Sequence, residues 1–77
     1  MGNAQAGVQL PSIFIFHGKP QPLIGTLSVV DLLAQLGYAG KRIAVELNGN
    51  VVPKSQHSST WIRVGDNFEI VVAVGGG

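Results

Sequence analysis

Hydrophobic positions along this chain follow two periods, and the two-residue period of a β-strand appears first. Residues 10–18, LPSIFIFHG, are rich in β-branched and aromatic residues and end at a glycine. Alternation places Phe14 and Phe16 on one face of this strand and Ile13 and Ile15 on the other. We therefore expect an amphipathic strand with one face in a core.

Shorter patterns predict the remaining strands. Residues 17–20 are interpreted as a turn and residues 21–27 as a second strand, which forms a hairpin with the first. Proline in this second strand predicts an edge position, because proline has no backbone N–H to donate. A strand is predicted over 41–47, followed by a tight turn at Asn48-Gly49 and a short strand at 51–52 that ends at Pro53. Residues 54–61 are interpreted as a helical turn or loop. A turn at 64–67 and a final strand over 68–74 complete the chain. In the strand over 41–47, one face carries Ile43, Val45 and Leu47. In the strand over 68–74, one face carries Phe68, Ile70 and Val72.

The period of an α-helix appears once. Ser28 is a suitable N-cap, and Asp31 follows at the spacing of a capping box. The next hydrophobic residues fall at i, i+3, i+4 and i+7 on one face, and they are Val29, Leu32, Leu33 and Leu36. Gly37 or Gly40 ends the helix.

This order of elements predicts an α+β roll, in which one main helix covers one face of a mixed four- to five-stranded sheet. The 77 residues suffice for one domain. We divide the chain into a flexible leader at 1–9, a folded domain at 10–74 and a flexible glycine tail at 75–77.

Composition narrows the classes of function. The chain is 45% hydrophobic and 12% charged, as a folded protein is, and its net charge is +1. That charge is too small for a protein that binds nucleic acid or an anionic membrane surface. No hydrophobic run reaches the length of a membrane span. The absence of cysteine excludes thiol chemistry and thiolate metal sites, and it favours a reducing, cytoplasmic location.

Few side chains suggest chemistry of their own. We interpret His17 and His57 as surface residues in polar turns rather than as metal ligands, and we expect no metal site. Trp61 is interpreted as a packing residue because no basic patch surrounds it. The four acidic residues are dispersed along the chain, which disfavours a catalytic pair, and they are Asp31, Glu46, Asp66 and Glu69.

The last residues, VAVGGG, are the strongest functional signal. Glycine loses the most backbone freedom on ordering, so Gly75, Gly76 and Gly77 add little to a fold. A bare terminal carboxylate can instead enter a narrow active site of another protein. There ATP could activate it as an acyl-adenylate for attack by a sulfur or amine nucleophile. The structural alternative is an end with no function.

Several segments together resemble the ThiS family of sulfur carriers in thiamine biosynthesis. They are VELNGNVVPKS, VGDNFEIVVAVGGG and the helix with Leu32, Leu33 and Leu36, and the resemblance covers residues 12–77. Two departures are His57, where the family often has tryptophan, and HGKP, where the first hairpin usually has Asn-Gly.

The resemblance implies a ubiquitin-like β-grasp fold and a role as a protein co-substrate rather than an enzyme. Gly77 would be adenylated by a ThiF-type enzyme, which uses ATP, and no cofactor would be bound by the chain itself. The adenylate would become a thiocarboxylate, with sulfur from a donor such as a cysteine desulfurase persulfide. The thiazole synthase ThiG would then accept the sulfur.

The predicted sheet also suggests a partner surface. Ile13 and Ile15, with Val71 and Ala73, fall on the face opposite the helix, and neighbouring central strands would bring them together. Val74 would extend this surface into the tail. The alternative is that loops cover these positions.

Three other readings share parts of this pattern. The small subunit of molybdopterin synthase, MoaD, has the same implied fold and a terminal Gly-Gly, although its tail usually carries prolines. A ubiquitin-like modifier attached to lysines is another alternative. A plain β-grasp interaction module, whose glycines have no chemistry, is the third.

Overall fold

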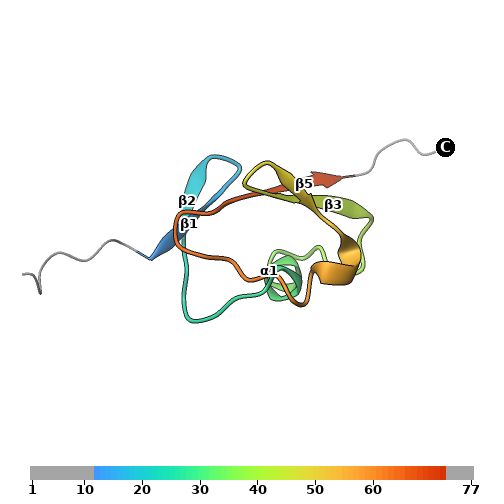
Figure 1. Cartoon of the computed structure of the whole chain (residues 1–77), viewed down its shortest axis with the longest axis horizontal. Coiled ribbons are helices and arrows are strands. Elements are labelled where there is room, and N and C mark those ends of the chain that lie inside the picture. The colour runs from blue at the N-terminus through green and yellow to red at the C-terminus, as the bar shows by residue number, and fades with distance from the viewer. Residues whose placement is uncertain (1–11, 73–77) are drawn as a thin grey trace, which may run out of the picture.

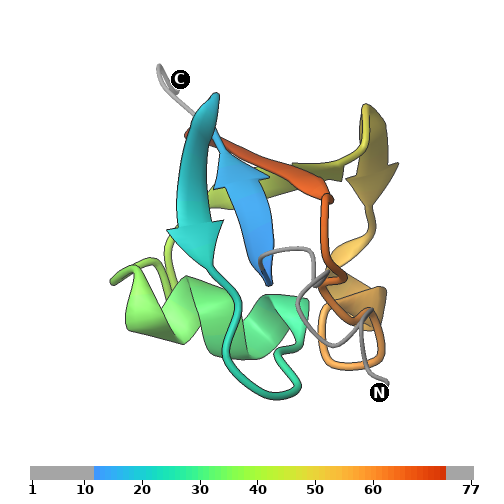
Figure 2. The same ribbon diagram turned by 90° about the vertical axis from the view of Figure 1, so that its left-hand side faces the viewer.

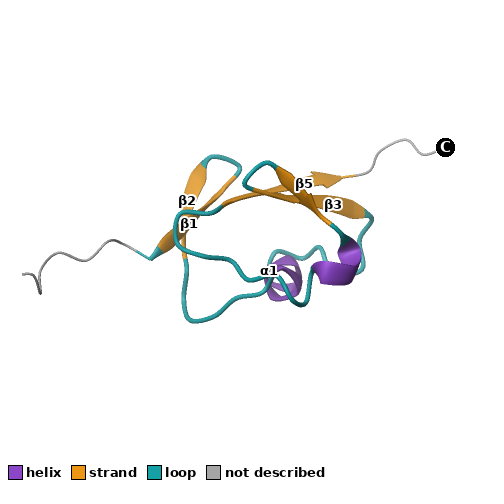
Figure 3. Cartoon of the chain, in the orientation of Figure 1, coloured by secondary structure: helices purple, strands orange, loops and turns teal. Residues whose placement is uncertain are grey.

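The structure is a computed structural model, and it describes residues 12–72. One sheet of five strands lies over one α-helix, as Figure 1 and the colouring of Figure 3 show. The elements are β1 (Ile13–Phe16), β2 (Lys19–Pro22), α1 (Val29–Gln35), β3 (Ile43–Leu47), β4 (Asn50–Val52), the 3₁₀-helix η2 (Lys54–Gln56) and β5 (Asn67–Val72). The predicted boundaries at residues 9 and 74 lie outside the described residues.

The strands follow the order β2-β1-β5-β3-β4, so the last strand of the chain is the middle strand of the sheet. β1 pairs with β5 in parallel, and all the other neighbouring strands are antiparallel. α1 crosses one face of this mixed sheet, as Figure 2 shows from the side of the β1–β2 hairpin. The predicted α+β roll is therefore confirmed, with five strands.

The core lies between α1 and the sheet. Val29, Leu32 and Leu33 are the buried residues of α1, which confirms three of the four predicted positions of its apolar face. The fourth, Leu36, follows the helix and is 36% exposed. The sheet side of the core consists of Phe14, Val45, Val52, Phe68 and Ile70, and the connecting segments add Leu27 and Ile62. Burying one such side chain contributes roughly 1.5–3 kcal/mol to stability.

Local signals set both ends of α1. The Ser28 hydroxyl accepts a hydrogen bond from the Asp31 N–H at 3.1 Å, which confirms the predicted N-cap. Gly37 follows the C-cap with φ +86°, a left-handed conformation that glycine adopts without strain. A helix of seven residues is too short to be stable alone, so its packing against the sheet stabilises it.

The first hairpin differs from its prediction. Its turn needs only His17 and Gly18, which have φ of 50° and 83°. β2 therefore begins at Lys19, two residues before the predicted start, and the chain from Leu23 to Leu27 is a loop. The predicted edge position of this strand is confirmed.

The second half of the chain follows its pattern closely. Asn48 and Gly49 form a two-residue turn with φ of 53° and 84°, as the Asn-Gly pair predicts. The predicted helical turn over 54–61 begins with η2. Neither helix within residues 12–72 has the length and apolarity needed to cross a membrane.

Candidate functional site at the end of β5

The predicted reactive tail extends from β5. The predicted site residues Gly75, Gly76 and Gly77, together with Ala73 and Val74, lie outside the described residues. The structure does describe the strand that precedes them. β5 pairs with β3 over five residues, from Leu47 opposite Phe68 to Ile43 opposite Val72. The last described residue of β5 therefore lies beside the first residue of β3.

The start of β5 is fixed by the turn between β3 and β4. The side-chain oxygen of Asn48 accepts from the Asn67 N–H at 2.9 Å, and the Asn48 backbone N–H donates to the Asn67 carbonyl at 2.8 Å. The Asn48 amide group also donates to a carboxylate oxygen of Asp66 at 3.0 Å. The other Asp66 oxygen accepts from the Arg63 N–H at 2.8 Å, so Asp66 stabilises the predicted turn at 64–67.

The later part of β5 is held on its β1 side by His17. The His17 backbone N–H donates to the Phe68 carbonyl at 3.3 Å, and the Ile70 N–H donates to His17 Nε2 at 3.1 Å. Because a backbone N–H is only a donor, Nε2 is the acceptor in this contact. The ring also packs edge-on against Phe16, with centroids 4.6 Å apart. His17 is exposed, as predicted, and it has a structural contact that its sequence position did not reveal.

The predicted partner surface is divided by the register of β1 and β5. Ile15 lies opposite Asn67, four residues before Val71 on β5. At roughly 3.3 Å per residue, Ile15 and Val71 are about 13 Å apart along the strand direction. Ile13 lies farther from Val71, and both isoleucines instead face the prolines of β2. The prediction that these side chains form one patch is wrong, because β1 ends at Phe16, before the level of Val71.

The same outer face brings together two acidic residues that the sequence shows as dispersed. Glu46 of β3 lies directly opposite Glu69 of β5. Val51 of β4 is the neighbour of Glu46 on the other side, and it is 65% exposed. Val71, which is 51% exposed, is opposite Ala44. The outer face near the end of β5 is therefore a mixture of small apolar and acidic side chains.

Two predictions about aromatic side chains are corrected. His57 is buried with 9% of its surface exposed, because it lies between the end of β4 and the first turn of α1. Its Nε2 is 3.1 Å from the Val52 carbonyl, and its own carbonyl accepts from the Val30 N–H at 3.0 Å. It is not a surface residue. Trp61 was expected to be a packing residue, but it is 50% exposed; its backbone forms an isolated bridge with Ser28. Within residues 12–72, no three His, Cys, Asp or Glu side chains gather as a metal site would require.

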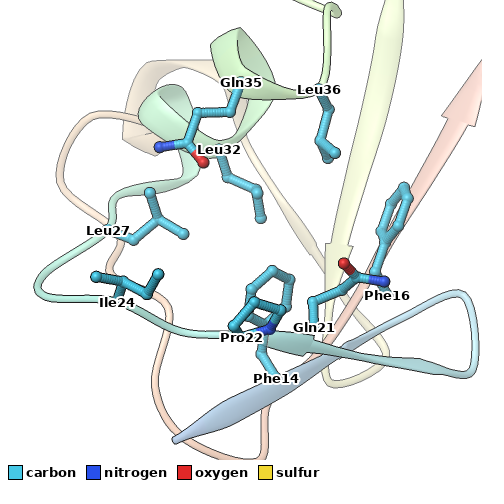
Figure 4. Close-up of a pocket in the computed structure, with 9 residues that line it drawn as sticks. All are labelled: Phe14, Phe16, Gln21, Pro22, Ile24, Leu27, Leu32, Gln35 and Leu36. Carbon is cyan, nitrogen blue, oxygen red and sulfur yellow. The ribbon is translucent and has the colours of Figure 1, made fainter.

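Two cavities flank α1. The larger, of about 440 Å³, lies between the helix and the β1–β2 hairpin. Figure 4 shows Leu27, Leu32 and Leu36 on the helix side, facing Phe14, Phe16 and Pro22 on the hairpin. Ile24, 81% exposed, lies at its edge. No charged side chain of the described part lines this cavity.

The smaller cavity, of about 300 Å³, lies on the other side of α1, between the loop that leads to β3 and η2. Apolar side chains and two lysines line it together with the buried His57. We call it the lysine pocket and define it by Val30, Leu33, Tyr38, Lys41, Ile43 and Lys54.

Comparison with known proteins decides the family. The model of the ThiS family matches residues 14–77, which include nearly all of the sheet and the three final glycines. The chain belongs to the ThiS family. This confirms the resemblance to the ThiS family found in the sequence.

A solved ThiS structure supports both the family and the fold. The crystal structure of the thiamine biosynthesis protein ThiS from Geobacter metallireducens is 34% identical, with a TM-score of 0.74. The match covers 84% of this chain and 99% of that protein. The ThiS β-grasp fold is therefore confirmed for this chain.

Relatives of the ThiS segment occur in two contexts. An uncharacterized protein ycf40 from Porphyra purpurea is 38% identical, and the match covers 79% of this chain and 86% of that protein. A protein named thiazole synthase from Paramagnetospirillum magneticum is 35% identical over 82% of this chain. This chain spans only 19% of the length of that thiazole synthase, and it spans the same share of another from Magnetococcus marinus.

Proposed function

We propose that this ThiS-family chain carries sulfur as a thiocarboxylate on Gly77 and delivers it to a thiazole synthase. The observation that carries the proposal is the family match, which continues from the fold through the glycines to residue 77. The described residues offer no cluster of three potential metal ligands, and the proposal requires none. In this role the chain is a co-substrate, and its partners supply the active sites.

The chemistry begins with activation of a poor electrophile. In the active site of a ThiF-type enzyme, the Gly77 carboxylate attacks the α-phosphate of ATP and releases pyrophosphate. A persulfide of the sulfur donor, such as a cysteine desulfurase, attacks the resulting acyl-adenylate and releases AMP. A thiol then cleaves the acyl disulfide and forms a disulfide with the donor, which leaves the carrier as a thiocarboxylate.

The sheet supports this role by fixing the base of the tail. β5 is the middle strand, and its last described residue, Val72, is paired with Ile43. The five residues from Ala73 to Gly77 span at most about 18 Å when fully extended. A partner that accepts Gly77 in its active site must therefore also contact the end of the sheet.

The partnership with a thiazole synthase is supported by the relatives of that name. In each of two such proteins, a segment similar to this chain forms about one fifth of a longer polypeptide. Segments joined in one chain commonly act together, because linkage raises their effective concentration. We therefore assign the thiazole synthase as the acceptor of the sulfur.

Intact-mass spectrometry tests the proposal. The protein is incubated with a ThiF-type enzyme, ATP and a sulfide source, and we expect the mass gain of one oxygen replaced by one sulfur. Deletion of Gly77 should abolish this gain. Lys19→Glu, an exposed change on the edge strand β2, should retain it. No gain in the wild-type chain, with an enzyme that is active on another carrier, would contradict the proposal.

A further inference from the structure

The lysine pocket combines an apolar interior with a positively charged rim. Leu33 is buried, and Tyr38 and Ile43 are half-buried, so hydrophobic surface faces the cavity. Lys41 and Lys54 are both exposed and reach the pocket from different elements. Lys41 belongs to the loop before β3, and Lys54 begins η2. The fold thus brings together two cations that are thirteen residues apart in sequence.

The charge of this pocket is not balanced by its own lining. Among the residues that the structure describes, no Asp or Glu lines it. Asp31 follows Val30 of the pocket in the first turn of α1, but it is not itself among the lining residues. Glu46 and Glu69 pair across β3 and β5, and Asp66 is bonded to Asn48 in the turn before β5. A partner that brings carboxylates to the rim would complement the two lysines.

The pocket also adjoins the base of the reactive tail. Ile43 lines the pocket, and it is the cross-strand neighbour of Val72, the last residue of β5. Val72 alternates with Phe68 and Ile70, so its side chain is on the helix side of the sheet, yet it is 50% exposed. Figure 1 shows β5 ending on the side of the molecule where η2 and the loop before β3 lie. An apolar surface therefore continues from the pocket through Ile43 to Val72.

We propose that the lysine pocket is the docking site for the thiazole synthase that receives the sulfur. The partner inserts a bulky apolar side chain between Leu33, Tyr38 and Ile43, and carboxylates beside it pair with Lys41 and Lys54. This inference rests on the proposed function, because it is transfer from the tail that brings the partner to this end of the sheet. The volume of about 300 Å³ is at the lower limit for small-ligand pockets, which favours a protruding side chain as the occupant.

The two parts of the pocket should have different signatures in binding. Reversal of both rim charges, Lys41→Glu with Lys54→Glu, should weaken affinity by about tenfold or more at low salt, mainly through slower association. The deficit should shrink as salt screens the exposed charges. Tyr38→Ala removes part of the apolar wall and should weaken binding at every salt concentration, through faster dissociation. Lys41→Gln with Lys54→Gln should have a smaller effect than charge reversal.

The experiment is a titration of each full-length variant with purified thiazole synthase and, separately, with a ThiF-type enzyme. Binding is measured by calorimetry and surface-based kinetics at two salt concentrations. Lys19→Glu is the control for net charge, because it reverses one lysine charge on β2, three strands away from β3. Circular dichroism and amide NMR spectra establish that each variant is folded. The proposal expects weak binding by the Lys41/Lys54 variants and wild-type binding by Lys19→Glu.

Three results would overturn the proposal. One is equal affinity of the wild type and the Lys41/Lys54 charge reversal. Another is a loss of affinity in Lys19→Glu equal to that of the double variant, which would show that net charge, and not the pocket, determines the affinity. The third is a loss that is confined to the ThiF-type enzyme, which would assign the pocket to activation. If the wild type shows the mass gain of a thiocarboxylate in these cases, the proposed function stands and the docking site alone is wrong.

Discussion

The two hairpins of this protein differ in sequence at their turns, yet both turns hold β5 in the same way. The first turn is His17-Gly18 and the second is Asn48-Gly49, and the leading residue has a φ of 50° in one and 53° in the other. Each leading residue donates its backbone N–H to a carbonyl of β5 and accepts a β5 N–H with its side chain. The comparison shows that one structural role is filled by different side chains.

The side chains replace a backbone carbonyl in each case. In an antiparallel hydrogen-bonded pair, two residues exchange both N–H···O bonds, and Asn48 and Asn67 would continue the β3–β5 pairing in this way. In the parallel β1–β5 pair, His17 would continue the pairing with bonds to Phe68 and Ile70. At His17 and at Asn48 the positive φ turns the chain away from β5, so the backbone carbonyl of that residue does not continue the pairing. Asn48 Oδ1 and His17 Nε2 then accept the N–H groups that the carbonyls would have accepted.

The two attachments are not equal in strength. Asn48 is also bonded to Asp66, which is itself bonded to the Arg63 N–H, so the start of β5 belongs to a network. His17 makes one side-chain hydrogen bond to β5, near the end from which the tail extends. We therefore expect local opening to begin at the later part of β5 on its β1 side. Three substitutions test this difference, in order of decreasing effect.

Phe68→Ala tests whether the core or the turns dominate the attachment of β5. Phe68 is fully buried, and its ring centroid is 6.0 Å from that of Phe16. Its truncation should lower the free energy of unfolding by about 3–5 kcal/mol, through lost burial and the cavity left behind. Urea denaturation followed by circular dichroism measures this. A loss no larger than that caused by either turn substitution would show that the turns, not the core, hold the strand.

Asn48→Ala tests the stronger attachment. The substitution removes both side-chain hydrogen bonds and places alanine at φ 53°. Because these bonds are exposed and water can replace them in part, we expect a loss of roughly 1–2 kcal/mol in the free energy of unfolding. Asn48→Gly is the control, since glycine tolerates this φ but lacks the bonds. Equal stability of the alanine and glycine variants would mean that backbone strain contributes nothing here.

The sequence was sufficient to predict the parts of the fold that depend on local patterns. The cap at Ser28, the apolar face of α1 and the Asn48-Gly49 turn each follow from residues within one turn of the chain. The start of β2 was missed because the pattern did not distinguish a two-residue His17-Gly18 turn from a four-residue one. A residue before glycine in a predicted turn was the available signal, and it was present at both hairpins.

The candidate site was predicted less completely, because its geometry depends on register. Alternation placed Ile15 and Val71 correctly on the same face of the sheet. Only the β1–β5 register shows that Ile15 lies opposite Asn67, four residues before Val71. The pairing of Glu46 with Glu69 also depends on register. The burial of His57 depends on its contacts with Val52 at the end of β4 and with Val30 of α1, which no period in the sequence encodes.

His17→Asn is the most sensitive test of the comparison, because asparagine fills the same role in the other hairpin. Asparagine tolerates a positive φ, so the turn should form. Its side-chain oxygen is one bond closer to the backbone than Nε2 of histidine, and we expect that it does not reach the Ile70 N–H. The free energy of unfolding should fall by only about 0.5–1 kcal/mol, the net value of one partly exposed hydrogen bond. Hydrogen exchange measured by NMR should show the Ile70 amide exchanging faster, while the Phe68 amide keeps its rate. His17→Gly should give the same result, since it also keeps the turn and lacks the acceptor. If the Ile70 amide stays protected in the asparagine variant but not in the glycine variant, the two turns are interchangeable and the longer reach of the imidazole is not required.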